Sequence, residues 1–120
     1  MYFSSPEELN KIVPICDGVW IKDYLYEYLV WSCNIKFEDY IENFFSDYLN
    51  DGNLADMLFS FLLDDDYDGS DSQMGAARLI SKLDRQVLQA KKEFLLKAQE
   101  NEVYWKRPFP PDTDNLDWLL

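Results

Sequence analysis

The sequence predicts a single all-α domain over residues 1–120, a helical bundle of about five helices with an extended, Pro-rich C-terminal segment. Apolar residues recur at spacings of three and four along most of the chain, which is the period of amphipathic helices. The content of 48% hydrophobic and 17% aromatic residues is too apolar for a disordered acidic chain. A chain of 120 residues can bury a sufficient core without metal or disulfides, and neither an internal repeat nor a linker divides it.

Two helices are predicted in the first third of the chain. The segment SPEE at 5–8 has the form of a capping box with proline at the first helical position, so a short helix should run to about Val13 and end at Pro14. Asp17-Gly18 then leads into a second helix, from about Val19 to Cys33. A strand is the alternative for the alternating tyrosines of this second helix, but no strand that would pair with it is visible.

The next two helices have the clearest patterns. Seven apolar residues share one helical face, and the segment NDG at 50–52 ends this third helix. These residues are Phe37, Tyr40, Ile41, Phe44, Phe45, Tyr48 and Leu49. Asn53 can cap a fourth helix, whose apolar positions are Leu54, Met57, Leu58, Phe61 and Leu62. Because only a short glycine turn joins them, these two helices should form an antiparallel hairpin.

The second half of the chain is predicted to hold an acidic loop, one long helix and a docked end. Residues 64–75, DDDYDGSDSQMG, form a polar loop with five carboxylates. A long helix from about Ser72 to Glu100 should be the spine of the bundle, with an apolar face of Ala76, Ile80, Leu83, Val87, Ala90 and Phe94. The segment 107–111 must be extended, because each proline pushes its predecessor out of the helical region. Residues 112–115 can cap a last turn that docks through Leu116, Trp118, Leu119 and Leu120.

The composition disfavours several classes of function. The chain has 11 basic and 23 acidic residues and a formal net charge of -12, so nucleic acid and anionic membranes would repel it. It contains no histidine, and hence no imidazole base, no histidine-activated nucleophile and no histidine-ligated metal. No glycine-rich phosphate loop is present. We therefore expect a non-enzyme that needs no cofactor.

The cysteines and the termini predict a cytoplasmic protein. Cys16 and Cys33 lie on opposite sides of a predicted helix and have no CxxC spacing, so they should be reduced, buried thiols. The N-terminus has early acidic residues and a helix-start pattern where a signal peptide has a basic region and an apolar run. No stretch approaches the ~20 apolar residues of a membrane span.

The acidic charge is unevenly distributed, and this predicts a binding surface. Residues 64–75 carry five acids and no base, whereas residues 76–107 carry eight bases and four acids. Crowded carboxylates repel one another, so a basic partner or a cation would stabilise them. The predicted contact set in the loop is Asp64, Asp65, Asp66, Tyr67, Asp68 and Asp71. A second patch on the third helix is Glu38, Asp39, Glu42 and Asp47, and Tyr26 lies off the core stripes with Tyr67 as a candidate aromatic anchor.

A calcium loop is an alternative for the acidic segment. Asp64-x-Asp66-x-Asp68-Gly69 matches the first half of an EF-hand loop, in which alternating carboxylates surround a hard cation. The second half departs from the pattern, because Gly75 occupies position twelve, where a bidentate glutamate is needed. A solvated or partner-facing acidic loop is the preferred interpretation, with an acidic calcium-responsive module as the alternative.

The chain resembles the immunity proteins of bacterial contact-dependent growth inhibition and related polymorphic toxin systems. The resemblance rests on small size, acidity and segments such as YLYEYLVWSCNIKFEDYIENFFSDYL and WKRPFPPDTDNLDWLL. It implies that a cognate toxin domain, often a nuclease with a basic cleft, is bound one to one and neutralised. The alternative from the same charge is a DNA-mimic inhibitor of a restriction or CRISPR nuclease, although the basic charge of the long helix argues against an extended phosphate-like track.

Overall fold

The computed structural model describes residues 1–67, 70–109 and 116–119. The chain is mostly helical, as predicted, and the described residues contain six α-helices where about five helices were expected. They are α1 (Lys22–Trp31), α2 (Ile35–Phe45), α3 (Gly52–Leu62), α4 (Asp71–Ile80), α5 (Arg85–Ala90) and α6 (Lys92–Gln99). The 3₁₀ helices are η1 (Pro6–Ile12), η2 (Asp65–Tyr67), η3 (Tyr104–Lys106) and η4 (Asp117–Leu119), and the strands are β1 (Ile15–Cys16) and β2 (Val19–Trp20).

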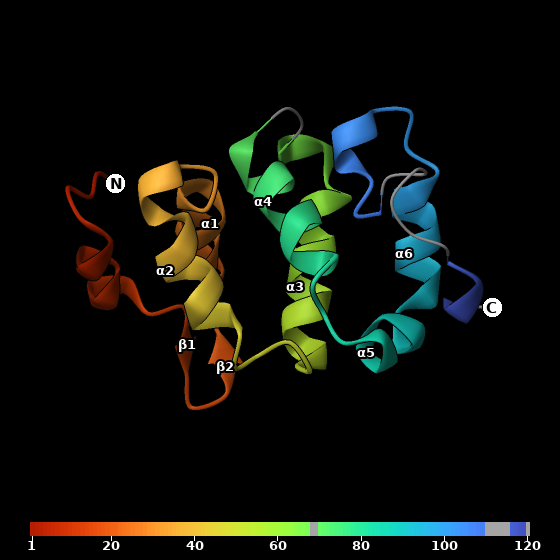
Figure 1. Ribbon diagram of the computed structural model, residues 1–120, viewed down its shortest axis with the longest axis horizontal. Coiled ribbons are helices and arrows are strands. Elements are labelled where there is room, and N and C mark those ends of the chain that lie inside the picture. Colours follow the sequence, from red (N-terminus) through yellow and green to blue (C-terminus); the bar gives the residue numbers. More distant parts are fainter. Residues whose placement is uncertain (68–69, 110–115, 120) are drawn as a thin grey trace.

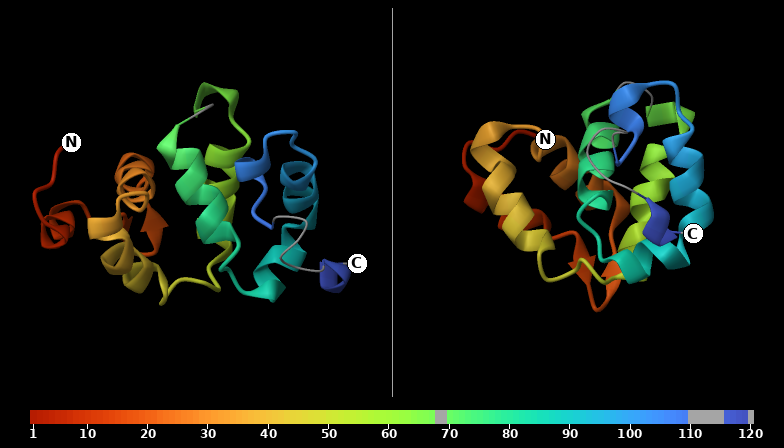
Figure 2. Two further views of the ribbon diagram at one scale, coloured as in Figure 1. Left: turned by 45° about the horizontal axis from the view of Figure 1, so that its top comes forward. Right: turned by 45° about the vertical axis from the view of Figure 1, so that its right-hand side comes forward.

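The elements form three groups along the longest axis of the molecule, which measures 41 Å (Figure 1). α1, α2 and the N-terminal segment lie at one end, α3 and α4 lie in the middle, and α5 and α6 lie at the other end, an order that the turned views preserve (Figure 2). α4 packs against both α3 and α1 and so joins the first two groups. No helix among the described residues has the length and apolar character needed to cross a membrane.

The contact between α1 and α4 depends on a glycine in the middle of α4. A Cβ atom at Gly75 would lie 2.4 Å from the carbonyl oxygen of Leu29 and 2.8 Å from Oγ of Ser32. Only a residue without a side chain lets the helices approach this closely. Leu25 of α1 and Ile80 of α4 are fully buried in the same core cluster, so the two helices meet in the main core.

A β-hairpin replaces the start of the second predicted helix. β1 and β2 pair antiparallel, with Ile15 opposite Trp20. Between the strands, Asp17 (φ 51°) and Gly18 (φ 79°) both have positive φ, as a two-residue type I′ turn requires. Aspartate followed by glycine is typical of that turn, so the prediction that this pair leads directly into a helix is wrong, and α1 begins only at Lys22.

The two cysteines lie in different environments. Cys16 is exposed on the hairpin, so the expectation of two buried thiols is wrong for this residue. Cys33 is half-buried beyond the end of α1, and its Sγ lies 3.4 Å from the carbonyl oxygen of Asp71. Burial raises the pKa of the Cys33 thiol. Both cysteines are free.

α2 and α3 do not form the predicted helical hairpin. α2 packs on α1 and η1, whereas α3 packs chiefly on α4. The side chain of Asn34 caps α2, which ends at Phe45, earlier than its apolar pattern suggested. Asp51, and not the predicted Asn53, caps α3 by accepting hydrogen bonds from two backbone N–H groups at 2.8 and 3.0 Å. The chain between the helices then carries α3 away from α2 (Figure 1).

The long helix predicted over 72–100 is broken into α4, α5 and α6. Asp84 is extended at the first break (ψ 141°), and its N–H donates to the carbonyl oxygen of Leu49 at 2.9 Å. A straight helix of that length would measure roughly 43 Å, more than the longest dimension of the whole molecule. The breaks instead let apolar side chains of all three helices and of the first break reach the core, namely Ile80, Leu83, Leu88, Leu95 and Ala98.

The capping box predicted at Ser5 does not form, and Glu8 instead binds the preceding residue, Ser4. The Glu8 carboxylate accepts hydrogen bonds from the hydroxyl of Ser4 at 2.7 Å and from its N–H at 3.0 Å, whereas Ser5 makes no side-chain cap. These hydrogen bonds favour the charged form and lower the pKa of Glu8. The helix that follows is the 3₁₀ helix η1, which ends before Pro14 as predicted.

The C-terminal turn docks on the body, as predicted. Leu119 of η4 is buried, and Gln89 of α5 donates a hydrogen bond to the carbonyl oxygen of Trp118 at 2.6 Å. The guanidinium group of Arg85 lies 4.9 Å from the centre of the Trp118 ring. The predicted cap at 112–115 and the predicted contact of Leu120 lie outside the described residues.

Candidate functional site

A groove between α3 and α6 brings acidic side chains next to an exposed aromatic ring. The volume of this α3–α6 groove is about 920 Å³. Phe59 and Leu63 line it from the side of α3, and Phe94 lines it from α6. The rings of Phe59 and Phe94 lie 5.8 Å apart, and Phe94 is 46% exposed. The charged residues of the groove are Asp56, Asp64, Asp65, Lys91 and Lys97.

The position of the acids relative to α3 is electrostatically unfavourable. Asp64 and Asp65 follow Leu63, the C-cap residue of α3, whose C-terminal end carries the negative end of the helix dipole. Acidic groups at that end of a helix cost roughly 0.3–1 kcal/mol each at low salt. A cationic partner bound at the end of the groove would remove this cost, so the arrangement suits recognition of positive charge.

The acidic segment, residues 64–67, is fixed by hydrogen bonds and ring contacts to the rest of the fold. Oδ1 of Asp64 accepts a hydrogen bond from the N–H of Asp66 at 2.9 Å, which orders the first turn of the segment. The ring of Tyr67 packs 5.0 Å from the buried ring of Phe61. The ammonium group of Lys22 lies 5.7 Å from the centres of both rings. Asp65 and Asp66 are exposed.

A buried glutamine ties the end of α3 to α4. Gln73 is 1% exposed, and its Nε2 donates to the carbonyl oxygens of Phe61 and Leu62 at 3.3 Å and of Asp64 at 3.0 Å. The last carbonyl groups of a helix have no partner within the helix, so this amide supplies the missing donor. The backbone that carries the acids is therefore fixed to the core.

The predicted loop residues do not all belong to one surface. The predicted loop over 64–75 is shorter than expected, because α4 begins at Asp71 and buries Ser72, Gln73 and Gly75. Asp71 is exposed at the start of α4, beside Cys33 and away from the α3–α6 groove. Asp68 lies outside the described residues.

The two tyrosines proposed as anchors are packed together and are not free on the surface. Tyr26 is half-buried, with its ring 6.2 Å from that of Phe61 and 6.0 Å from that of Tyr67. Tyr67 is also half-buried. Both tyrosines therefore support the acidic segment from the core side. The exposed ring of Phe94 is the candidate aromatic anchor in their place.

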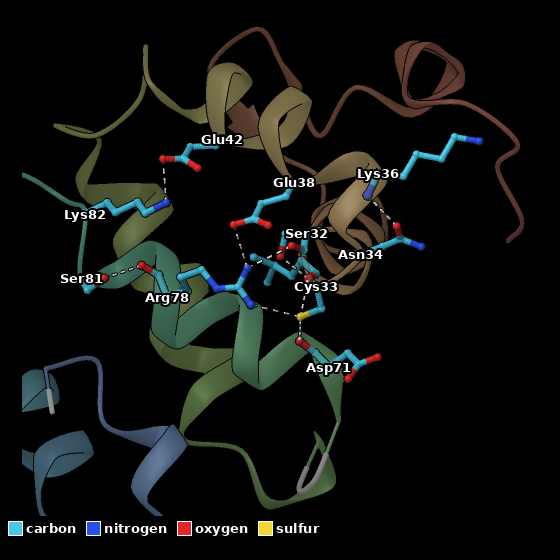
Figure 3. A network of polar contacts seen from close by, with 11 residues as sticks. Ser32, Cys33, Asn34, Lys36, Glu38, Glu42, Asp71, Arg78, Ser81 and Lys82 are labelled. Atoms are coloured by element: carbon cyan, nitrogen blue, oxygen red, sulfur yellow. Dashed lines mark hydrogen bonds and ion pairs between the residues drawn. The ribbon is translucent and has the colours of Figure 1, made fainter.

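The second acidic patch divides into two pairs. Glu38 and Glu42 point toward bases on α4, with Glu38 3.9 Å from Arg78 and Glu42 2.8 Å from Lys82 (Figure 3). Asp39 and Asp47, the other two members of the patch, are exposed on the surface. α2 lies on the opposite side of α4 from α6, so this patch is separate from the α3–α6 groove (Figure 1).

Phe94 is the residue of the groove that the sequence pattern did not predict. It follows the apolar spacing of a single long helix and was expected in the core. The break at Lys91 (φ -110°, ψ 27°) turns α6 so that Leu95 and Ala98 are buried while Phe94 and Leu96 face outward. The one available signal was the run of three apolar residues at 94–96, because three consecutive residues cannot share a single helical face.

The local structure departs from an EF-hand loop at its second half. Gly75, at the twelfth position of the motif, lies inside α4 against the backbone of Leu29. Among the described residues, no cluster of three or more histidine, cysteine, aspartate or glutamate side chains is placed to hold a metal ion.

Taken together, the α3–α6 groove offers carboxylates, apolar walls and an exposed ring to a second molecule. Aromatic rings beside a charged rim are typical of protein–protein contact surfaces. Comparisons with protein-family models, with curated proteins and with solved structures found no match to this chain.

Proposed function

We propose that this protein binds a basic protein through the α3–α6 groove and acts as the immunity protein of a toxin. The observation that carries the proposal is the meeting of Asp64, Asp65 and the exposed ring of Phe94 at one groove. The chain has a formal net charge of -12, so its long-range field attracts positively charged proteins. No catalytic step is part of this function.

The acids and the ring have different tasks in this proposal. Carboxylates at the end of the groove steer a basic surface into place and raise the association rate. Lys91 is held by Asp56 at 2.8 Å, so this pair is neutral, and the remaining charged residues of the groove are two acids, Asp64 and Asp65, and one base, Lys97. Phe94 and the apolar wall beneath it supply the buried contact that slows dissociation.

The resemblance to immunity proteins suggests the class of the partner. A nuclease toxin has a cleft lined with lysine and arginine for its nucleic acid substrate, and this cleft complements a cluster of carboxylates. The partner would therefore be a toxin domain of a nuclease, bound one to one. A host restriction or CRISPR nuclease would point to the DNA-mimic alternative.

Capture of the partner tests this proposal. The tagged protein is incubated at low ionic strength with lysate of its native host, and the bound proteins are identified by mass spectrometry. We expect a basic toxin domain encoded next to this chain, whose binding weakens as salt rises, because exposed charges are screened. Capture of a protein with no basic surface, with an affinity independent of salt, would contradict the proposal.

Reversing the charges of Asp64, Asp65 and Asp66 together should weaken binding of the captured partner well over tenfold. All three are changed to lysine, and the affinity is measured by calorimetry at low salt. The matched control reverses three exposed acids on the α2 side of the molecule, Glu7, Asp39 and Asp47. Both variants change the net charge equally, so the control should lose much less affinity. A larger loss in the control would place the contact on the α2 side of the molecule.

A further inference from the structure

A separate apolar cavity lies between α1, α2 and α4. Its volume is about 130 Å³, and the exposed residues among its lining are Glu42, Ser46 and Lys82. Its walls are mainly aliphatic and aromatic side chains, those of Leu29, Ile41, Phe45, Leu49 and Leu79. Gly75 also lines it, at the point where α4 touches α1.

The size and lining of the cavity suit one apolar ring. Protein interiors are close-packed, and voids larger than a water molecule are few. An apolar cavity of roughly 150 Å³ lined by leucine, isoleucine and phenylalanine stays dry and takes up a benzene-sized ligand. The present cavity has a similar volume and an apolar inner wall, but it is open to the surface, and the polar residues Glu38, Glu42, Arg78 and Lys82 also line it.

The charges at the mouth cancel one another. Glu38 and Glu42 are four residues apart on α2, Arg78 and Lys82 are four apart on α4, and each acid faces one base (Figure 3). Arg78 also donates a hydrogen bond to the carbonyl oxygen of Ser32 at 3.0 Å. An anionic or cationic ligand would have to displace an ion pair, whereas an uncharged ligand passes between them.

We propose that this cavity is a binding site for a small uncharged apolar molecule of about one aromatic ring. The site is distinct from the α3–α6 groove and does not depend on the function proposed for it. Toluene is the probe, with benzylamine and benzoate as its cationic and anionic counterparts. We expect toluene to bind with a Kd on the order of 1 mM or tighter, and both charged probes to bind about tenfold more weakly.

The binding site is located by NMR on the intact protein. Saturable shifts and ring-to-methyl contacts should map to Leu29, Ile41 and Leu79. A Leu49→Phe variant should fill the cavity and abolish binding, whereas Leu116→Phe, the same change at a half-buried position in the C-terminal segment, should leave it unchanged. If Leu49→Phe does not fold, the contacts in the native protein decide.

Three results would overturn the proposal. The first is the absence of saturable shifts with millimolar toluene. The second is a set of shifts that maps away from the cavity. The third is tighter binding of benzylamine or benzoate than of toluene, which would assign the mouth to a charged ligand.

Discussion

Replacing Phe61 by alanine should lower the free energy of unfolding by about 3–5 kcal/mol. Phe61 is fully buried, and its ring contacts the rings of Tyr26 and Tyr67 at 6.2 and 5.0 Å. The substitution removes the ring and leaves a cavity directly under the acidic segment. Small domains have a total stability of about 5–15 kcal/mol, so the loss is a large part of it. Urea denaturation measures the effect as a lower midpoint with an unchanged slope.

Phe94→Ala is the matched control for this change. The same atoms are removed from a ring that is 46% exposed and lies tilted against the ring of Phe59 at 5.8 Å. We expect a loss of about 1 kcal/mol or less. Equal losses at the two positions would contradict the assignment of Phe61 to the core and of Phe94 to the groove surface.

Gly75→Ala should lower the free energy of unfolding by about 1–3 kcal/mol. In the middle of an exposed helix the same change would raise stability, because alanine is the better helix former by about 1 kcal/mol. Here the new methyl group would lie 2.4 Å from the carbonyl oxygen of Leu29, so α1 and α4 must move apart. Unfolding in urea should therefore show the opposite sign from that expected of helix propensity.

Gly52→Ala provides the control for the glycine prediction. Gly52 is the first residue of α3, and nothing lies within 4 Å of a Cβ atom built there. This substitution should leave stability unchanged or raise it by up to about 1 kcal/mol. A Gly75→Ala variant with the same free energy of unfolding as the native protein, or a higher one, would contradict the close approach of α1 and α4.

The helical class of the fold was predictable because apolar spacing is a local property. α2 and α3 follow patterns that are visible within a dozen residues, and their existence was expected from those patterns alone. The break at Asp84 was not predictable in this way. It is stabilised by the carbonyl oxygen of Leu49, which is distant in the sequence, and the apolar spacing continues across it.

The hairpin was missed for a different reason. The sequence contained the correct turn signal in Asp17-Gly18, but strands of two residues are too short to show an alternating pattern. The helical spacing that follows the turn extends over more residues than either strand, and it favours a helix from the turn onward.

The candidate site was predictable only in part. The cluster Asp64–Asp66 is evident from the sequence, and so is its charge. The groove beside it depends on how α6 is turned, and hence on two breaks in a predicted continuous helix. In the same way, Glu38 and Glu42 look like a free acidic patch until the fold places Arg78 and Lys82 opposite them.

Association and dissociation rates of the captured partner test the α3–α6 groove most directly. Surface plasmon resonance compares the native protein, the Asp64, Asp65 and Asp66 charge-reversal variant, and Phe94→Ala. We predict that charge reversal lowers the association rate about tenfold or more and reduces its dependence on salt. Phe94→Ala should instead raise the dissociation rate about tenfold or more. Unchanged rates in both variants, with a partner that still binds tightly, would contradict recognition through this groove.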